Sequence, residues 1–228
     1  DFCDQLLEEV KHYQASGLPQ RAPNSMNNYG LVLNEVGLRA SFDAFLKGFM
    51  LGIGARLFGE HEVRERRLHG ADVCTEDWGG STLSSHHTFI VRYRPDEDRS
   101  LDMHVDECDV TFNFGLVDSS GFEGSDLAIC GMFGDAEHRK YLHTYKHVKG
   151  RCVMHSGKRR HGAQNITQGE RASLIMWTKS PEFRKTEAYA RRWGRRAEIA
   201  KETGEPDLIC LSQTHDPDYD KWVRKIDR

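Results

Sequence analysis

Residues 87–93 read HTFIVRY, and residues 109–116 read DVTFNFGL. In both stretches large apolar or aromatic side chains recur at every second position, which is the period of a half-buried β-strand. Further short strand candidates lie at 126–133, 141–148, 151–156 and 171–178, with glycine-bearing turns between them. Several short strands at this spacing predict a β-sandwich or barrel.

Helical patterns flank this β-rich region. Residues 2–15 place Phe2, Leu6, Val10 and Tyr13 on one helix face, and Ser41 is positioned to cap a second helix. That second helix would turn six apolar side chains inward: Phe42, Phe45, Leu46, Phe49, Met50 and Ile53. Residues 19–33 have the composition of a loop, and residues 182–201 return to a helical pattern.

We therefore predict one domain over residues 1–228, mainly β with flanking helices. Its parts would be a helical N-terminal support (1–68), a β core (86–180), and a C-terminal helix and tail (181–228). Residues 184–201 hold seven Lys/Arg against two Glu, which we interpret as a solvated helix face. A phosphate-binding surface is the alternative.

Composition excludes several classes of protein. Of the 228 residues 38% are hydrophobic and 29% charged, which is typical of a globular chain, and the net charge of -3 provides no basic field for nucleic acid. No apolar run reaches the roughly 20 residues of a membrane span. The six cysteines form no CxxC pair, so we disfavour a zinc ribbon and expect reduced, mostly buried thiols. We favour an intracellular protein, although the chain begins without methionine and a targeting segment could have been removed.

The stretch LDMHVDECDV, residues 101–110, carries the first two residues with metal-binding chemistry. In an extended strand, residues two apart point to the same face, so His104 and Asp106 would converge while Met103 and Val105 turn away. A neutral imidazole and a carboxylate are good ligands for Fe(II). This pair occurs by chance in many sequences, so it needs a third ligand.

The stretch HSGKRRHGAQNITQGERASLIMW, residues 155–177, supplies His161 and Arg171. If residues 158–164 and 171–178 pair across the turn between them, these two side chains become neighbours. The planar fork of an arginine binds a carboxylate through two hydrogen bonds. The hydroxyl of Ser173, two residues on, would point the same way. Two histidines and one carboxylate leave three positions open on an octahedral metal. Two of these positions suit a chelating 2-oxo acid and one suits O2. Zinc usually takes a tetrahedral set of ligands, so this pattern favours Fe(II).

Four segments carry a resemblance to a known family: APNSMNNYG (22–30), FIVRY (89–93) before HVD (104–106), HSGKRRHGA (155–163) and GERASLIMW (169–177). The chain resembles the Fe(II)- and 2-oxoglutarate-dependent oxygenase superfamily in its prolyl 4-hydroxylase-like branch. Within it, the likeness is to PKHD-type hydroxylases and 2-oxoglutarate and iron-dependent oxygenase domain-containing proteins. The resemblance implies a double-stranded β-helix, or jelly roll.

The resemblance also assigns roles to residues. It implies iron ligands at His104, Asp106 and His161, and a cosubstrate site at Arg171 with Ser173. Tyr93 and Thr111 would line that cosubstrate site. Asn27, Asn28 and Tyr29 would lie beside the active site, with Asn28 and Tyr29 near the substrate. His155 is the other candidate ligand, but His161 stands ten residues before Arg171, as in the family. A departure is Ser125, where the branch commonly has glycine in a Gly-Gly-acid-Leu turn.

The implied activity is hydroxylation of a C–H bond on a protein or peptide side chain, prolyl or lysyl, with succinate and CO2 as co-products. The implied cofactors are Fe(II), 2-oxoglutarate and O2, with ascorbate as a further candidate. A non-catalytic jelly-roll binding module is one alternative. A nucleic-acid demethylase on the same fold is another, but such proteins have a further arginine six residues after the cosubstrate arginine, and Trp177 stands there. Oligomeric state is not indicated.

Overall fold

Two nine-residue strands, β2 (Ser85–Tyr93) and β11 (Arg171–Lys179), pair antiparallel along their whole length. The computed structural model describes residues 1–59, 77–133 and 141–190. The β2–β11 register runs from Arg171 opposite Tyr93 to Lys179 opposite Ser85. The alternating patterns at 87–93 and 171–178 are therefore strands, as predicted.

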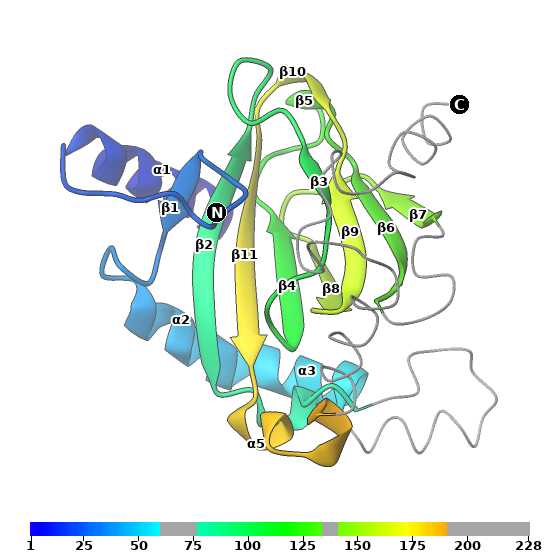
Figure 1. Cartoon of the computed structure of the whole chain (residues 1–228). Coiled ribbons are helices and arrows are strands. Elements are labelled where there is room, and N and C mark those ends of the chain that lie inside the picture. The colour runs from blue at the N-terminus through cyan, green and yellow to red at the C-terminus, as the bar shows by residue number, and fades with distance from the viewer. Residues whose placement is uncertain (60–76, 134–140, 191–228) are drawn as a thin grey trace.

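The other strands complete two larger sheets and one small one (Figure 1). The major sheet has the order β1-β2-β11-β4-β8 and the minor sheet the order β3-β9-β6-β7, while β5 pairs with β10. The bounds are β1 (Gly30–Val32), β3 (Leu101–His104), β4 (Val110–Gly115), β5 (Phe122–Gly124), β6 (Leu127–Met132), β7 (Tyr141–Tyr145), β8 (Cys152–Ser156), β9 (Arg159–Ala163) and β10 (Ile166–Gly169). All strand pairs are antiparallel, and the chain alternates between the two large sheets. This is the predicted double-stranded β-helix.

Alternate side chains of strand β11 point to opposite faces of the major sheet. Ala172, Leu174 and Met176 face the core that the N-terminal helices cover. Arg171, Ile175 and Trp177 face the other way and line a pocket between the sheets. The period of two therefore buries one set of side chains against helices and presents the other set to the site.

The N-terminal helices are α1 (Phe2–Ala15), α2 (Arg39–Phe45), a π-helical segment (Leu46–Met50) and α3 (Leu51–Phe58). The first helix matches the prediction, although Phe2 is exposed. The second begins at Arg39, so the predicted cap at Ser41 is wrong. Phe49 and Ile53, predicted to face inward, are 66% and 39% exposed. The wider π turn explains this, because it gives the buried residues a spacing of four: Phe42, Leu46, Met50, Gly54 and Phe58.

Part of the predicted loop 19–33 is a strand. β1 (Gly30–Val32) pairs with β2, with Gly30 opposite Val91. Gly30 has φ 147°, and a Cβ there would lie 1.9 Å from the carbonyl oxygen of Ile90. Glycine is therefore required where the chain approaches β2, although the same glycine made the sequence look like a loop.

After β11 the chain forms a short helix, α5 (Pro181–Arg184), capped by the hydroxyl of Ser180, which packs near the 3-10 turn η2 (Gly80–Thr82). Most of the predicted basic helix at 184–201 lies outside the described residues, as do Cys74 and Cys210. The described cysteines, Cys3, Cys108, Cys130 and Cys152, are free thiols, as expected. No helix in the described ranges is both long and apolar enough to cross a lipid bilayer.

Candidate metal centre and cosubstrate pocket

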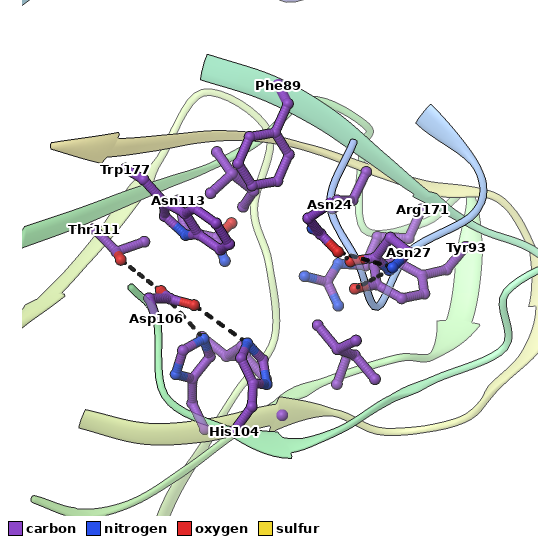
Figure 2. Close-up of a pocket in the computed structure, with 17 residues that line it drawn as sticks. Asn24, Asn27, Phe89, Tyr93, His104, Asp106, Thr111, Asn113, Arg171 and Trp177 are labelled. Carbon is purple, nitrogen blue, oxygen red and sulfur yellow. Dashed lines mark hydrogen bonds and ion pairs between the residues drawn. The ribbon is translucent and has the colours of Figure 1, made fainter. Parts of the chain in front are cut away.

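Three side chains meet at one end of the pocket. Strand β3 ends at His104, and His161 of β9 lies directly opposite it. The ligand atoms of His104, Asp106 and His161 all lie within 4.8 Å of one another, and all three residues are buried. Nε2 of His104 is 3.2 Å from Oδ1 of Asp106 (Figure 2). Nε2 of His161 is 3.6 Å from Oδ2 of the same carboxylate. The structure thus brings together the group that the sequence predicted.

Backbone carbonyls fix the ring protons of both histidines. Nδ1 of His104 lies 2.8 Å from the carbonyl oxygen of Asp102, and Nδ1 of His161 lies 2.8 Å from that of Arg159. A carbonyl can only accept, so each Nδ1 carries the proton and each Nε2 of a neutral ring presents a lone pair. This anchoring is typical of histidines that bind a metal. The donor set therefore fits a divalent cation.

Electrostatics keep Asp106 ionised and the His161 ring neutral, which are the forms that bind a metal. Burial lowers the pKa of His161 to about 3, so the ring is neutral at ordinary pH. Burial opposes ionisation of Asp106, but the surrounding imidazoles outweigh burial and hold the pKa of that carboxyl below its usual range. Asp106 is therefore an anion beside the neutral ring of His161.

Thr111 and His155 stand next to this group. Thr111 lines the pocket, as predicted, and its hydroxyl donates to Oδ2 of Asp106 at 2.5 Å. His155 is buried, and its Nε2 lies 3.9 Å from the same oxygen, farther than that of His161. His161 rather than His155 belongs to the group within 4.8 Å.

Arg171 and Tyr93 stand at the other end of the pocket, which holds about 410 Å³ of empty space including its open mouth (Figure 2). The Arg171 guanidinium carbon lies 5.1 Å from the centre of the Tyr93 ring. Nη1 donates to the carbonyl oxygen of Ser125 at 2.6 Å and to its hydroxyl at 3.1 Å. Nη2 donates to the Ser173 hydroxyl at 3.3 Å, so Ser173 shares the arginine's face as predicted.

Arg171 forms no ion pair with a carboxylate among the described residues, and Asp126 acts on its charge only from a longer distance. The Arg171 side chain is buried, its partners in the structure are neutral, and its Nε has no hydrogen-bond partner there. Burial lowers the pKa of this guanidinium, which reflects the cost of removing the charge from water. A buried cation of this kind is stabilised by an anion, and the pocket gives one access.

His161 and Arg171 are not brought together by the predicted pairing of residues 158–164 with 171–178, so that prediction is wrong. Strand β9 pairs with β3 and β6, whereas β11 pairs with β2 and β4. The two residues therefore face each other from opposite sheets instead of lying on one hairpin. Residues 166–169 form β10, which pairs with β5, so the chain crosses between the sheets here.

Ser125 keeps the backbone geometry that favours glycine, with φ 55°. Ser125 therefore differs from the usual glycine through its side chain, whose hydroxyl accepts a hydrogen bond from Arg171.

His138, His143 and His147 alternate with aromatic residues in the sequence, a pattern that predicts all three at the surface. His143 is exposed and His138 lies outside the described residues, but His147 is buried, so that prediction is wrong. Nε2 of His147 lies 2.9 Å from Oδ1 of Asn113, a pocket-lining residue, and 3.4 Å from Nη2 of Arg171. Burial and the neighbouring guanidinium lower the pKa of His147 to about 2.

The asparagine-rich loop reaches the pocket through Asn24 and Asn27; of the three residues predicted beside the site, Asn27, Asn28 and Tyr29, only Asn27 lines it. Asn24 accepts from the backbone of Met26 and Asn27, and this turn directs Asn24 and Asn27 to the pocket wall. The Asn27 amide donates to the Tyr93 hydroxyl at 3.3 Å. Asn28 and Tyr29 are exposed, and their backbone amides donate to Asp98 instead. Neither lines the pocket.

Known proteins resemble this chain in fold and in sequence. A solved structure titled "prolyl hydroxylase in complex with hypoxia inducible factor oxygen degradation domain peptide fragment from Trichoplax adhaerens" superposes over 81% of each chain, with a TM-score of 0.50 and 14% sequence identity. That likeness shows the fold. The chain is 35% identical over 199 residues to the 2-oxoglutarate and iron-dependent oxygenase domain-containing protein ICU11 of Arabidopsis thaliana, which covers 83% of this chain and 45% of that protein.

A human protein gives the same result. Over 184 residues the chain is 33% identical to 2-oxoglutarate and iron-dependent oxygenase domain-containing protein 2 of Homo sapiens, covering 80% of this chain and 47% of that protein. The chain therefore carries a 2-oxoglutarate and iron-dependent oxygenase domain. More particularly, residues 1–62 match the family model of the OGFOD2-like domain. The chain spans about half the length of the curated relatives it matches.

Proposed function

We propose that this chain uses Fe(II) and 2-oxoglutarate to hydroxylate a C–H bond of a protein or peptide side chain, with prolyl and lysyl groups as the first candidates. Succinate and CO2 would be the co-products. One observation carries the proposal: a buried group of two histidines and a carboxylate shares a pocket with a buried arginine that forms no ion pair among the described residues. The first suits a ferrous ion and the second suits a dicarboxylate.

His104, Asp106 and His161 would hold the iron. Bound there, Fe(II) supplies the activation of O2 that C–H oxidation needs. The chain itself positions the ligands, because backbone carbonyls hold both rings and Thr111 holds the carboxylate. Apolar side chains on the pocket wall, Phe89, Val91 and Ile175, limit the access of water.

Arg171 would bind the far carboxylate of 2-oxoglutarate. Its Nε is buried without a partner in the described structure, and the Tyr93 ring lies beside the guanidinium. Ser125 and Ser173 hold the other nitrogens and so fix the direction of the fork. The cosubstrate would then extend from Arg171 toward the metal centre with its 2-oxo acid end.

The polar wall near Arg171 supports a peptide substrate. Asn24 and Asn27 present side-chain amides, which can both donate to and accept from a peptide backbone. Trp177, half-buried in the pocket wall, adds an aromatic surface. The structural neighbour from Trichoplax adhaerens was solved with a peptide fragment, which agrees with this substrate class.

Incubation of the protein with Fe(II), 2-oxoglutarate and a peptide library tests the proposal. The expected result is iron-dependent succinate and a peptide that gains one oxygen atom by mass spectrometry. His161→Ala should abolish both products, whereas His155→Ala at saturating iron should retain much of the turnover. The reverse order would contradict the ligand assignment.

The two alternatives give different results in the same assay. A non-catalytic binding module would form no iron-dependent succinate under any condition. A nucleic-acid demethylase would turn over methylated DNA or RNA but no peptide, and would shift DNA or RNA in a gel. Either outcome would overturn the proposal as stated.

A further inference from the structure

Three imidazoles, not two, lie beside Asp106. The ring centres of His104 and His161 are 4.3 Å apart, and those of His161 and His155 are also 4.3 Å apart. The Nε2 atoms of all three lie near the Asp106 carboxylate, at 3.2, 3.6 and 3.9 Å for His104, His161 and His155. His155 thus continues the arrangement that the two proposed ligands begin.

His155 is anchored in the same way as the two proposed ligands. Its Nδ1 lies 2.9 Å from the carbonyl oxygen of Ser156, so this nitrogen carries a proton. All three rings therefore use Nδ1 to bind a backbone carbonyl and turn Nε2 toward Asp106. In a protein this anchoring commonly sets the direction and tautomer of a metal-binding histidine.

Nε2 of His155 is a buried polar atom without a partner. No described residue hydrogen-bonds to it, and the residue is only 6% exposed. The 3.9 Å to Asp106 is too long for a hydrogen bond. Leaving such an atom unsatisfied destabilises the folded state, so an arrangement of this kind indicates a missing partner.

The sheet register directs His155 to the site. β8 pairs with β4, and His155 lies opposite Thr111, the residue that binds Asp106. Cross-strand partners share a face of the sheet, so the His155 ring is on the side of the metal centre. A cation bound to the triad would provide the partner that Nε2 lacks.

We propose that His155 is a fourth group of the metal centre, whose Nε2 faces the bound cation directly or through one metal-bound water. It would strengthen the binding of divalent cations, Zn(II) and Co(II) in particular, before 2-oxoglutarate enters. This proposal rests on the proposed assignment of His104, Asp106 and His161 as the metal ligands.

The test measures metal binding without turnover. Zn(II) affinity is determined by competition with a chelator, and Co(II) coordination by visible absorption, both in the absence of 2-oxoglutarate. His155→Phe keeps a ring but removes both nitrogens, and we expect it to weaken Zn(II) binding on the order of 10- to 100-fold. His155→Gln, which returns a polar group near the Nε2 position, should restore part of the loss.

The controls separate the two proposals. His143→Phe alters an exposed histidine and should leave affinity unchanged. His104→Ala should lose tight binding, and thermal unfolding with and without Zn(II) checks that each variant folds. A changed Co(II) spectrum in His155→Phe indicates direct ligation, and a loss of affinity with the same spectrum indicates contact through water; both support the proposal. If His155→Phe matches the wild type while His104→Ala fails, this inference is overturned and the proposed function stands. If the wild type itself binds no metal, both are overturned.

Discussion

The hydroxyl of Thr111 donates a hydrogen bond of 2.5 Å to Oδ2 of Asp106, and both residues are buried. One carboxylate oxygen is thereby engaged by the protein. The other, Oδ1, lies 3.2 Å from Nε2 of His104. Asp106 is therefore positioned to give a cation one oxygen and not two, which leaves more of the coordination shell for other ligands.

Thr111→Val should weaken metal binding, because valine keeps the shape of the side chain but loses the donor that orients Asp106. We expect Fe(II) or Mn(II) affinity to fall by on the order of 10-fold or more. Thr111→Ser, which retains the hydroxyl, should restore most of it. Thr167→Val, at an exposed threonine, is the matched control. Calorimetric titration gives the affinities, and equal values for wild type and Thr111→Val would show that the hydrogen bond does not position a ligand.

Arg171→Met should raise the KM for 2-oxoglutarate far more than it changes kcat at saturating cosubstrate. The variant fills similar space but cannot pair with a buried carboxylate, and such a loss is on the order of 100-fold, or roughly 3 kcal/mol. Arg94→Met, at an arginine 39% exposed that pairs with Glu170, is the control. Initial rates of succinate formation at varied 2-oxoglutarate measure the effect. An unchanged KM would assign the cosubstrate carboxylate to another residue.

Ser125→Gly and Ser125→Ala should differ in stability. Both lose the hydroxyl that accepts from Arg171, but only alanine keeps a Cβ at φ 55°. The left-handed conformation costs about 1–2 kcal/mol for a residue with a Cβ, so the glycine variant should be the more stable of the two by about 1 kcal/mol or more. Urea unfolding of the two variants compares them. Equal midpoints would mean that the turn relaxes when the hydroxyl is removed.

The sequence predicts the features of the site that depend on residues close together in the chain. It does not predict those that depend on pairing between distant segments. The spacing of two between His104 and Asp106 is local, and its consequence holds: Met103 packs with Ala128 and Cys130 in a separate buried cluster. Which strands become neighbours is a long-range property. The hairpin between residues 158–164 and 171–178 was the simplest local pairing, but burial of both sheets against each other selects a crossover.

Residues whose role depends on packing are not visible in a linear pattern. His147 alternates with aromatic residues in a polar stretch, which resembles a surface strand, yet the structure buries it against Asn113. The motif points to Asn28 although Asn24 lines the pocket, because the motif alone does not show which asparagine the turn directs inward. The hydrogen bonds from Met26 and Asn27 to its side chain decide that, and an Asx-turn pattern was the available signal.

His147 should make the folded state less stable as the pH falls. Its pKa is lowered from 6.5 to about 2 on folding, first by burial and then by Arg171. Between these values the unfolded chain binds a proton that the folded chain does not. The unfolding free energy therefore rises with pH through this window, and the contribution of His147 is complete above pH 6.5. The slope for one proton is roughly 1.4 kcal/mol per pH unit.

Glutamine does not titrate in this range, so His147→Gln lacks this proton uptake on unfolding. As the pH is lowered from 6.5 to 5, the unfolding free energy of the variant should therefore fall less steeply than that of the wild type. His143→Gln, at an exposed histidine, should follow the wild type. Denaturant unfolding at several pH values gives both slopes. Parallel slopes for wild type and His147→Gln would contradict a buried neutral imidazole.

Trp177→Ala should raise the KM for a peptide substrate while leaving the KM for 2-oxoglutarate nearly unchanged. The half-buried Trp177 ring lies on the pocket wall. It packs edge-to-face against Phe89, with the two ring centres 4.9 Å apart, and this contact holds it in place. An aromatic surface in this position offers contact area to an incoming side chain at little entropic cost. Tyr29→Ala is the matched control, because Tyr29 is an exposed aromatic residue outside the pocket. We expect the tryptophan variant to lose at least ten times more peptide affinity than the tyrosine variant, equivalent to about 1.4 kcal/mol. The opposite order would place the substrate on the Asn28–Tyr29 side of the loop.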